Sequence, residues 1–445
     1  MSGPAFLVSL GVLAVSTAGM LARVEPFATW FYPFAWYSTL LMTEAAVGRR
    51  DGRFFFLGRP RFALSLFGWS IPFWLFFELL NLRLTNWYYV FVPDGALARW
   101  TGILISFATV LPAIFLAERA LRAYGPWTEG ADDDPLRWGP VVTGSRLGER
   151  GLLVLQALGL ACLLLPLAWP GIFFPLVWVA VTLIADPWVY RRDRERSLLH
   201  DVETGRPGRP IRLLVGGMAI GLLWELLNFG ARGKWIYTVP GLEELKLLEM
   251  PLLGFFGFPF LALEGWSAYQ ALVLAGLAVG PDEHAGPANR HAEAGARPAA
   301  RPGWTLPAAG LAAVFSALVL SSMERGTISS TTPRLEDLER PPAAHLRAAG
   351  LDVFELAGAE PEELSARFGA TPEQARAWID EARLVTLRGI GVVNADRLRA
   401  VGVDSVHDLA GRDPDALAAR LATTGHAVAE ARVRVWVRAA LHAFP

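Results

Sequence analysis

The chain has 445 residues, of which 53% are hydrophobic, with a formal net charge of −1 and a mean hydropathy of +0.35. This composition is typical of integral membrane proteins and excludes an ordinary soluble enzyme. The single cysteine, Cys162, excludes a disulfide framework and a cysteine metal site. All seven histidines lie outside the apolar runs, which excludes histidine-ligated metals and Ser-His or Cys-His catalysis within the membrane. We therefore expect neither a metal nor a cofactor.

Nine apolar runs are long enough to cross a bilayer as helices. They cover residues 5–22, 28–47, 63–82, 101–121, 151–168, 171–190, 211–228, 251–279 and 304–322. The predicted fold is all-α, a polytopic membrane bundle followed by a C-terminal helical domain. The first run lacks a basic segment and a small-residue cleavage site, so we expect a retained helix and not a signal peptide.

An internal duplication with a spacing of about 147 residues is the most informative pattern in the chain. One copy reads Phe77-Glu78-Leu79-Leu80-Asn81, then Trp87 and Tyr89, and the other reads Trp224-Glu225-Leu226-Leu227-Asn228, then Trp235 and Tyr237. Further matches pair Pro33 with Pro175, Trp36 with Trp178, Glu44 with Asp186, Arg49-Arg50-Asp51 with Arg191-Arg192-Asp193, Pro112 with Pro259, and Glu118 with Glu264. Residues 1–124 and 151–280 are therefore predicted to be two repeats of four helices each, joined by an inner loop at 125–150.

The distribution of basic residues predicts the orientation. With a cytoplasmic N-terminus, the inner connections carry 20 Lys and Arg and the outer ones carry six, as the positive-inside rule requires. Four crossings per repeat make the two repeats parallel, related by an axis along the membrane normal. Glu44 and Asp186, near the inner helix ends, are expected to pair with the neighbouring arginines. The abundance of Arg over Lys favours a bacterial source, and we expect the inner (plasma) membrane.

Residues 281–303 are polar and rich in Ala, Pro and Gly, which predicts a linker before a ninth membrane helix at 304–322. Nine crossings would place the domain at 335–445 outside the cytoplasm. That domain has its own duplication, in which Ala349-Gly350-Leu351-Asp352 is answered by Val401-Gly402-Val403-Asp404. Between the copies, Leu387-Arg388-Gly389-Ile390-Gly391 has the glycines that a tight turn between two helices needs.

These residues, together with His345-Leu346-Arg347-Ala348-Ala349-Gly350 and Val406-His407-Asp408-Leu409-Ala410, resemble the tandem helix-hairpin-helix family known as domain of unknown function 4332. The resemblance implies a helix-hairpin-helix fold and no established activity. Related hairpins in DNA repair proteins bind phosphate through backbone N–H groups of the turn, which would involve Gly389, Gly391 and the adjacent Arg388. Residues 334–445 hold 14 Arg against 17 Asp and Glu, however, and this acidic balance favours a protein partner over nucleic acid.

The acids within the apolar runs are the candidate functional residues, because an ionisable group is costly there and usually has a task. Glu78 with Asn81, and Glu225 with Asn228, each share one helix face that we expect to point inward. One interpretation is a helix-locking hydrogen-bond network. The other is a cavity lined by these four residues and by Glu264. Trp87, Tyr89, Trp235 and Tyr237 suit either an interfacial aromatic belt or the rim of that cavity.

Three functions agree with this pattern. The first is binding or translocation of a small or amphipathic ligand at an acidic, aromatic-rimmed site between the repeats. The second is a membrane enzyme that acts on a lipid or isoprenoid, with a buried Glu as general acid and aromatic faces that stabilise a carbocation. The third is a membrane-anchored scaffold that presents the C-terminal domain to a protein partner. In each case membrane lipid surrounds the helices.

Overall fold

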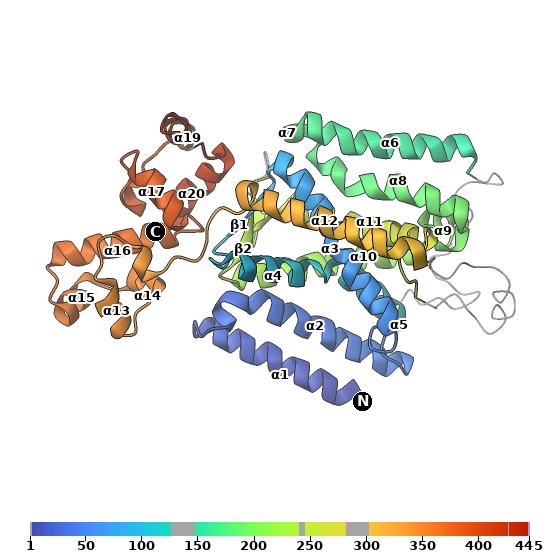
Figure 1. Ribbon diagram of the computed structural model, residues 1–445, viewed down its shortest axis with the longest axis horizontal. Helices are drawn as coiled ribbons and strands as arrows, with labels where there is room; N and C mark the ends of the chain where they lie inside the picture. Colours follow the sequence, from blue (N-terminus) through green and yellow to red (C-terminus); the bar gives the residue numbers. More distant parts are fainter. Residues whose placement is uncertain (1, 126–146, 240–244, 282–301, 426, 444–445) are drawn as a thin grey trace. The chain divides into compact units, whose positions relative to one another are not determined.

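The computed structural model describes residues 2–125, 147–239, 245–281, 302–425 and 427–443. The chain forms two compact units (Figure 1). The helical unit comprises Met1–Leu84, Trp100–Ala231 and Glu244–Met323, and the C-terminal unit comprises Thr85–Arg99, Arg232–Glu243 and Glu324–Pro445. The predicted inner loop at 125–150 and linker at 281–303 lie almost entirely outside the described residues.

Helices, most of them long and apolar, build the helical unit. They are α1 (Ser2–Leu21), α2 (Phe27–Asp51), α3 (Pro60–Leu84), α4 (Ala96–Phe107), α5 (Val110–Tyr124), α6 (Glu149–Ala168), α7 (Pro170–Phe173), α8 (Val177–Arg192), α9 (Leu198–Glu203), α10 (Gly208–Gly230), α11 (Gly257–Leu274) and α12 (Pro302–Gly326), with 3-10 turns η1 (Phe174–Leu176), η2 (Arg194–Arg196) and η3 (Leu252–Phe256). Helices α1 and α2 lie side by side, as do α6 and α8 (Figure 1). The mainly helical fold agrees with the all-α prediction.

Seven described segments are helices long and apolar enough to cross a membrane, which identifies a multi-pass membrane protein. They are Gly3–Leu21, Pro60–Leu84, Ala96–Tyr124, Glu149–Ala168, Pro170–Arg192, Gly208–Gly230 and Leu306–Gly326. The predicted crossings at 28–47 and 251–279 form α2 and α11, which are not among the seven. The reason is composition: Trp, Tyr, Thr and Pro residues make α2 less apolar than the other spans, and Glu264 and Gln270 do the same in α11.

Two carboxylates hold the loops that follow α2 and α8. Glu44 Oε1 accepts hydrogen bonds from the backbone N–H groups of Phe56 (2.6 Å) and Leu57 (3.0 Å). Asp186 accepts them from Leu198 (3.1 Å) and Leu199 (2.8 Å), at the same sequence offsets of 12 and 13 residues. The expectation that these acids pair with the neighbouring arginines was therefore wrong. Both acids are buried, and they bind the backbone N–H groups that the turn would otherwise leave without partners.

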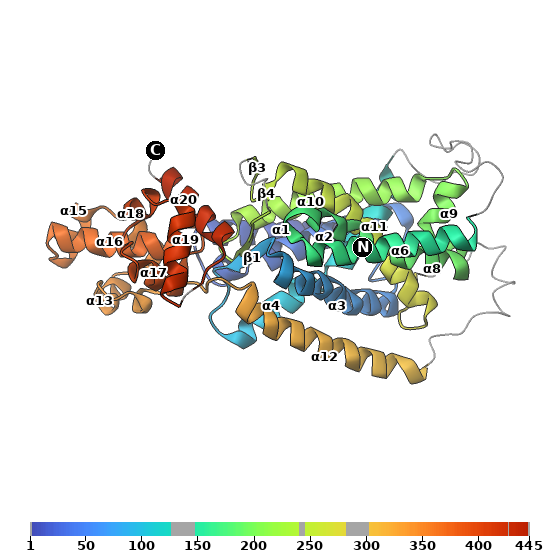
Figure 2. The same cartoon turned by 90° about the horizontal axis from the view of Figure 1, so that it is seen from above.

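The C-terminal unit joins a small ribbon to a domain of short helices. Strands β1 (Trp87–Val90) and β2 (Lys234–Tyr237) pair antiparallel, and a further pair, β3 (Lys246–Leu247) with β4 (Met250–Pro251), lies in the helical unit. Figure 2 shows the short helices gathered together. They are η6 (Leu335–Asp337), α13 (Ala343–Ala348), α14 (Val353–Gly358), α15 (Pro361–Phe368), α16 (Pro372–Thr386), α17 (Gly391–Arg399), α18 (Val406–Ala410), α19 (Pro414–Thr423) and α20 (Glu430–Ala443).

Glu381 anchors this domain from inside its core. The side chain is 1% exposed and accepts hydrogen bonds from the backbone N–H groups of Glu339 (2.9 Å) and Arg340 (3.1 Å). It also forms an ion pair of 2.8 Å with Arg399, which binds the exposed Asp396 as well. A buried carboxylate with donors on three sides is strongly held.

Replacing Glu381 with Ala is expected to lower the free energy of unfolding of the C-terminal unit by about 3 kcal/mol, because the change leaves buried donors without an acceptor. Hydrogen exchange of peptides from α20, measured on the full chain, reports this loss. Asp396→Ala is the matched control, since it removes the exposed partner of the same arginine and should cost less than about 1 kcal/mol. Equal losses in the two variants would contradict the assignment of Glu381 as the anchor.

Candidate functional site

The two predicted Glu-Asn pairs are fully buried in the helical unit. Glu78 and Asn81 lie near the end of α3, and Glu225 and Asn228 lie near the end of α10, each with an exposed fraction of 0%. The inward orientation expected for both faces is confirmed. Each pair lies on one helix face, so each helix presents a carboxylate and an amide to the interior.

Tryptophan rings connect the two acidic segments. The indole N–H of Trp74 donates to Glu78 Oε1 at 2.9 Å, and the Trp74 ring meets the Trp224 ring edge-on with centroids 5.8 Å apart. Trp224 immediately precedes Glu225 on α10. An aromatic contact of this kind stabilises the packing beyond the area it buries. One hydrogen bond and one ring contact thus link Glu78 to the residue beside Glu225.

Two further ring contacts are reciprocal. Trp36 of α2 packs against Trp224 of α10, with centroids 5.6 Å apart, and Trp178 of α8 stacks on Phe77 of α3 at 5.3 Å. In the sequence alignment Trp36 corresponds to Trp178, and Phe77 corresponds to Trp224. Exchanging the two aligned stretches therefore turns one contact into the other, which is the pattern of an interface around a two-fold axis.

The fourth predicted helix of each stretch is interrupted at the same place. Helix α4 ends at Phe107 and α5 begins at Val110, while η3 gives way to α11 at Gly257, 147 residues after Val110. Each interruption lies two or three residues before Pro112 or Pro259. Proline cannot donate the i to i−4 hydrogen bond, and its ring collides with the carbonyl four residues earlier. Discontinuous helices expose backbone polar groups inside a membrane protein, often at binding sites.

The first interruption is stabilised by polar side chains. Ser70 Oγ donates to the Phe107 carbonyl at 2.6 Å and accepts from the Leu111 N–H at 3.0 Å, and Trp36 Nε1 donates to Thr109 Oγ1 at 2.8 Å. The residue corresponding to Ser70 is Gly217, where an added Cβ would lie 2.5 Å from the carbonyl oxygen of Phe258. The Ser70 hydroxyl thus bridges the first interruption. At the second interruption, the backbones of α10 and α11 approach each other closely at Gly217.

Glu264 lies apart from the contacts described for the Glu-Asn pairs. It is fully buried on α11, and its Oε1 accepts from the backbone N–H of Val181 on α8 at 2.9 Å. Its Oε2 has no hydrogen-bond partner among the described residues. Its aligned counterpart, Glu118, instead forms a buried ion pair of 2.8 Å with Arg212. The two acids therefore have different local roles, and the place of Glu264 in a common site stays a prediction.

The four predicted aromatic residues lie in the C-terminal unit. On the β1–β2 ribbon Trp87 faces Tyr237 and Tyr89 faces Trp235, with Tyr88 opposite Ile236 at the centre. Since side chains alternate between the faces of a strand, these four rings share one face of the ribbon. Trp235 Nε1 donates to Tyr237 Oη at 2.9 Å. The register is symmetric about its centre, because Trp87 corresponds to Trp235 and Tyr89 to Tyr237.

Neither strand was predicted. Each strand has only four residues, too few for a reliable alternating pattern, and a ribbon formed by two copies of one short segment has no local turn to reveal it. The available signal was the doubled aromatic spacing itself, because Trp87 and Tyr89, like Trp235 and Tyr237, are two residues apart.

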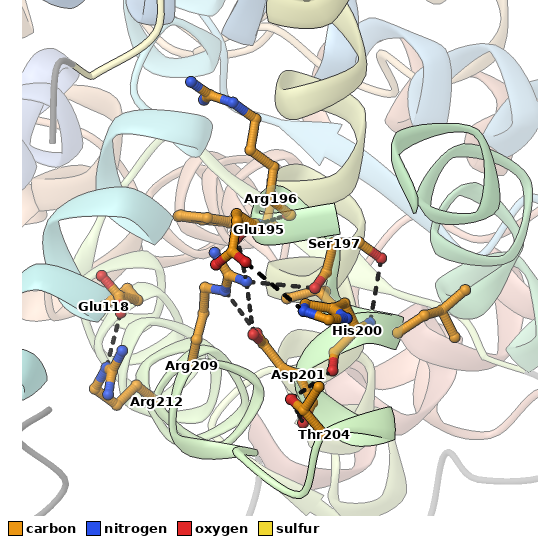
Figure 3. A network of polar contacts seen from close by, with 12 residues as sticks. Glu118, Glu195, Arg196, Ser197, His200, Asp201, Thr204, Arg209 and Arg212 are labelled. Atoms are coloured by element: carbon orange, nitrogen blue, oxygen red, sulfur yellow. Dashed lines mark hydrogen bonds and ion pairs between the residues drawn. The ribbon is translucent and has the colours of Figure 1, made fainter. Parts of the chain in front are cut away.

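A polar network around α9 joins several helices (Figure 3). Arg209 binds both carboxylate oxygens of Asp201, at 2.7 and 2.8 Å, and the Glu118–Arg212 pair connects α5 to α10. Arg196 donates to Gln270 on α11 at 2.9 Å. These groups hold neighbouring helices together through ion pairs and hydrogen bonds, so we assign the network a structural role. Within the described chain, no group of three or more His, Cys, Asp or Glu side chains is placed to hold a metal ion.

The predicted hairpin glycines form the turn between α16 and α17. Gly389 and Gly391 have φ angles of +80° and +66°, and Arg388 between Leu387 and Gly389 has +28°. Only glycine adopts the first two angles without strain. The turn that the sequence predicted at these positions is present.

Comparison with known proteins adds one identification. No curated protein and no solved structure matches the chain. A family match covers the Gly389–Gly391 turn and all of α16 to α19. It begins after the first duplicated unit of the C-terminal domain, which lies near Gly350. Residues 363–441 match the family described as Domain of unknown function (DUF4332).

Proposed function

We propose that the helical unit consists of two homologous halves that bind or translocate a small or amphipathic ligand between them. Two observations together carry this proposal. Glu78 and Glu225 occupy corresponding positions and are both fully buried, and the ring contacts Trp36–Trp224 and Phe77–Trp178 are reciprocal. Burial of a carboxylate among apolar helices lowers stability. Such a residue therefore usually has compensating hydrogen-bond donors or is kept for a function.

The repeat is supported by three independent correspondences. The ring contacts of the helical unit are reciprocal, the β1–β2 register is symmetric about its centre, and Glu44 and Asp186 bind loop N–H groups at equal offsets. An even number of crossings per half makes both halves parallel, with the symmetry axis along the membrane normal.

The chemistry of the site favours a ligand with hydrogen-bond donors. Each half presents one carboxylate and one amide, which accept from hydroxyl or ammonium groups, and the surrounding tryptophan rings accommodate apolar or cationic surface. A proton, an organic cation or the polar head of a lipid fits best.

A membrane enzyme is the second candidate. The specific observation in its favour is the cluster of Trp74, Phe77 and Trp224 rings around Glu78, which could stabilise positive charge next to a general acid. An isoprenoid or lipid would be the substrate. The scaffold alternative assigns the acids only to helix locking.

The proposed site is tested by replacing Glu78 and Glu225 with Gln together. These changes preserve size and replace both carboxyl groups with amides, so the variant is expected to fold and to lose the small molecules or lipids that stay bound to the wild type. Native mass spectrometry of protein released from its membrane measures those bound species. Glu149→Gln is the control, because that carboxylate is 70% exposed.

Identical bound species in the wild type and the double variant would contradict the ligand site and favour the scaffold. Lipid extracts of cells with and without the protein separate the remaining two functions. An enzyme changes the composition of the extract, whereas a carrier leaves it unchanged.

For the topology, we propose nine crossings, a cytoplasmic N-terminus and a bacterial plasma membrane. β1 pairs with β2 and also with residues 327–332, so all three segments lie on one side of the membrane. Among the described residues between β2 and residue 327, Leu306–Gly326 is the one long apolar span, so an even number of crossings requires α11 to cross as well. The excess of basic residues in the other connections places the ribbon outside.

A reporter enzyme that works only outside the cytoplasm is therefore expected to be active when fused after Pro445. The same reporter fused within residues 282–301, between α11 and α12, is expected to be inactive, because that connection is cytoplasmic in this arrangement. Enzyme activity in intact cells measures both fusions. Equal activity of the two fusions would contradict the crossing of α12, and a reversed pattern would contradict the orientation.

A further inference from the structure

Strand β1 has a second neighbour besides β2. After α12 ends, residues 327–332 run parallel to β1, and the backbone N–H of Tyr89 donates to the Thr327 carbonyl at 2.8 Å. The N–H of Ser329 donates to the Tyr89 carbonyl at 2.8 Å, and the N–H of Thr332 to the Val92 carbonyl at 3.0 Å. Both edges of β1 are therefore hydrogen-bonded, and residues 327–332 extend the ribbon by a third strand.

The Gly389–Gly391 turn packs directly on this three-stranded arrangement. A Cβ at Gly389 would overlap Val90 Cγ1, and a Cβ at Gly391 would lie 2.5 Å from the Cβ of Ser330. From the start of α17, Asn394 Nδ2 donates to the Ser329 carbonyl at 3.1 Å. The two glycines are thus needed both for the left-handed backbone and for close contact with the ribbon.

Apolar and cationic contacts enlarge the same interface. Tyr88, Val90, Phe91 and Ile236, on the ribbon, form one buried cluster with Val435 of α20. The Arg432 guanidinium lies 4.8 Å from the Tyr88 ring centroid and donates to the Gly326 carbonyl at 2.7 Å. Within the strands, Tyr88, Val90 and Ile236 lie on the face of the ribbon opposite to Trp87, Tyr89, Trp235 and Tyr237, because the side chains alternate.

We propose that the Gly389–Gly391 turn is a docking surface for the ribbon of the same chain and does not bind nucleic acid. A hairpin turn that binds phosphate must present its N–H groups to the ligand, and here Val90 and Ser330 cover the turn. β1 follows α3 by two residues, and β2 follows α10 by three. The matched domain therefore ties together the connections that leave the two helices with buried acids. This inference does not depend on any ligand of the helical unit.

Hydrogen exchange of the full chain, measured on the peptide that spans residues 85–92, tests the docking. Gly389→Ala is expected to speed exchange of this peptide by about tenfold, because the added methyl group collides with Val90. Gly402→Ala is the matched control, since Gly402 also has a positive φ of +75° but open space around it. Val90→Ala in the Gly389→Ala background is expected to restore part of the protection, which distinguishes a local collision from an unfolded domain.

Equal exchange rates in the Gly389→Ala and Gly402→Ala variants would overturn the proposal, as would an absence of any restoration by Val90→Ala. The nucleic-acid alternative is tested on the same proteins with fluorescently labelled duplex DNA. No binding, or binding that Gly389→Ala leaves unchanged, is expected. DNA binding by the wild type that Gly389→Ala abolishes would overturn the proposal.

Discussion

Burial of Glu78 and Glu225 is the constraint on which the rest of the helical unit depends. A carboxylate with no exposed surface requires hydrogen-bond donors close by, so α3 and α10 must turn their Glu-Asn faces inward. The lipid-facing surface is then left to the least buried spans, α1 and α6, whose apolar side chains are largely exposed. The interior orientation of two side chains thus determines which helices are peripheral.

The groups around the two acids differ between the aligned sequence stretches. Trp74, which donates to Glu78, corresponds to Gly221, where the Phe258 ring lies against the helix backbone. Ser70 likewise has a polar side chain where the corresponding residue, Gly217, has none. Glu225 is therefore surrounded by different groups from Glu78, although both are equally buried.

Much of this arrangement could be predicted from the sequence, and the failures have physical causes. The duplicated Glu-Asn spacing indicated inward faces, because this feature depends only on local geometry. The helix interruptions near Pro112 and Pro259 were not predicted, since each lies within one continuous apolar run. The acceptor role of Glu44 and Asp186 could not be predicted, since an acid near arginines suggests an ion pair, whereas the loop N–H groups required an acceptor. The β1–β2 ribbon could not be predicted, because its hydrogen bonds join residues about 150 positions apart in the sequence. Whether the aromatic residues and the acids form one site stays a prediction.

The three-stranded arrangement in the C-terminal unit also bears on the order of assembly. Its strands come from residues 87–90, 234–237 and 327–332, so the sheet needs partners that are synthesised at widely separated times. Contacts between such distant segments form slowly, because long loops must close first. One edge of β1 can pair with β2 before α12 is synthesised, whereas the other edge has no partner until residues 327–332 follow. The last segment of the sheet lies directly after α12, so the sheet is complete only once that helix has been made.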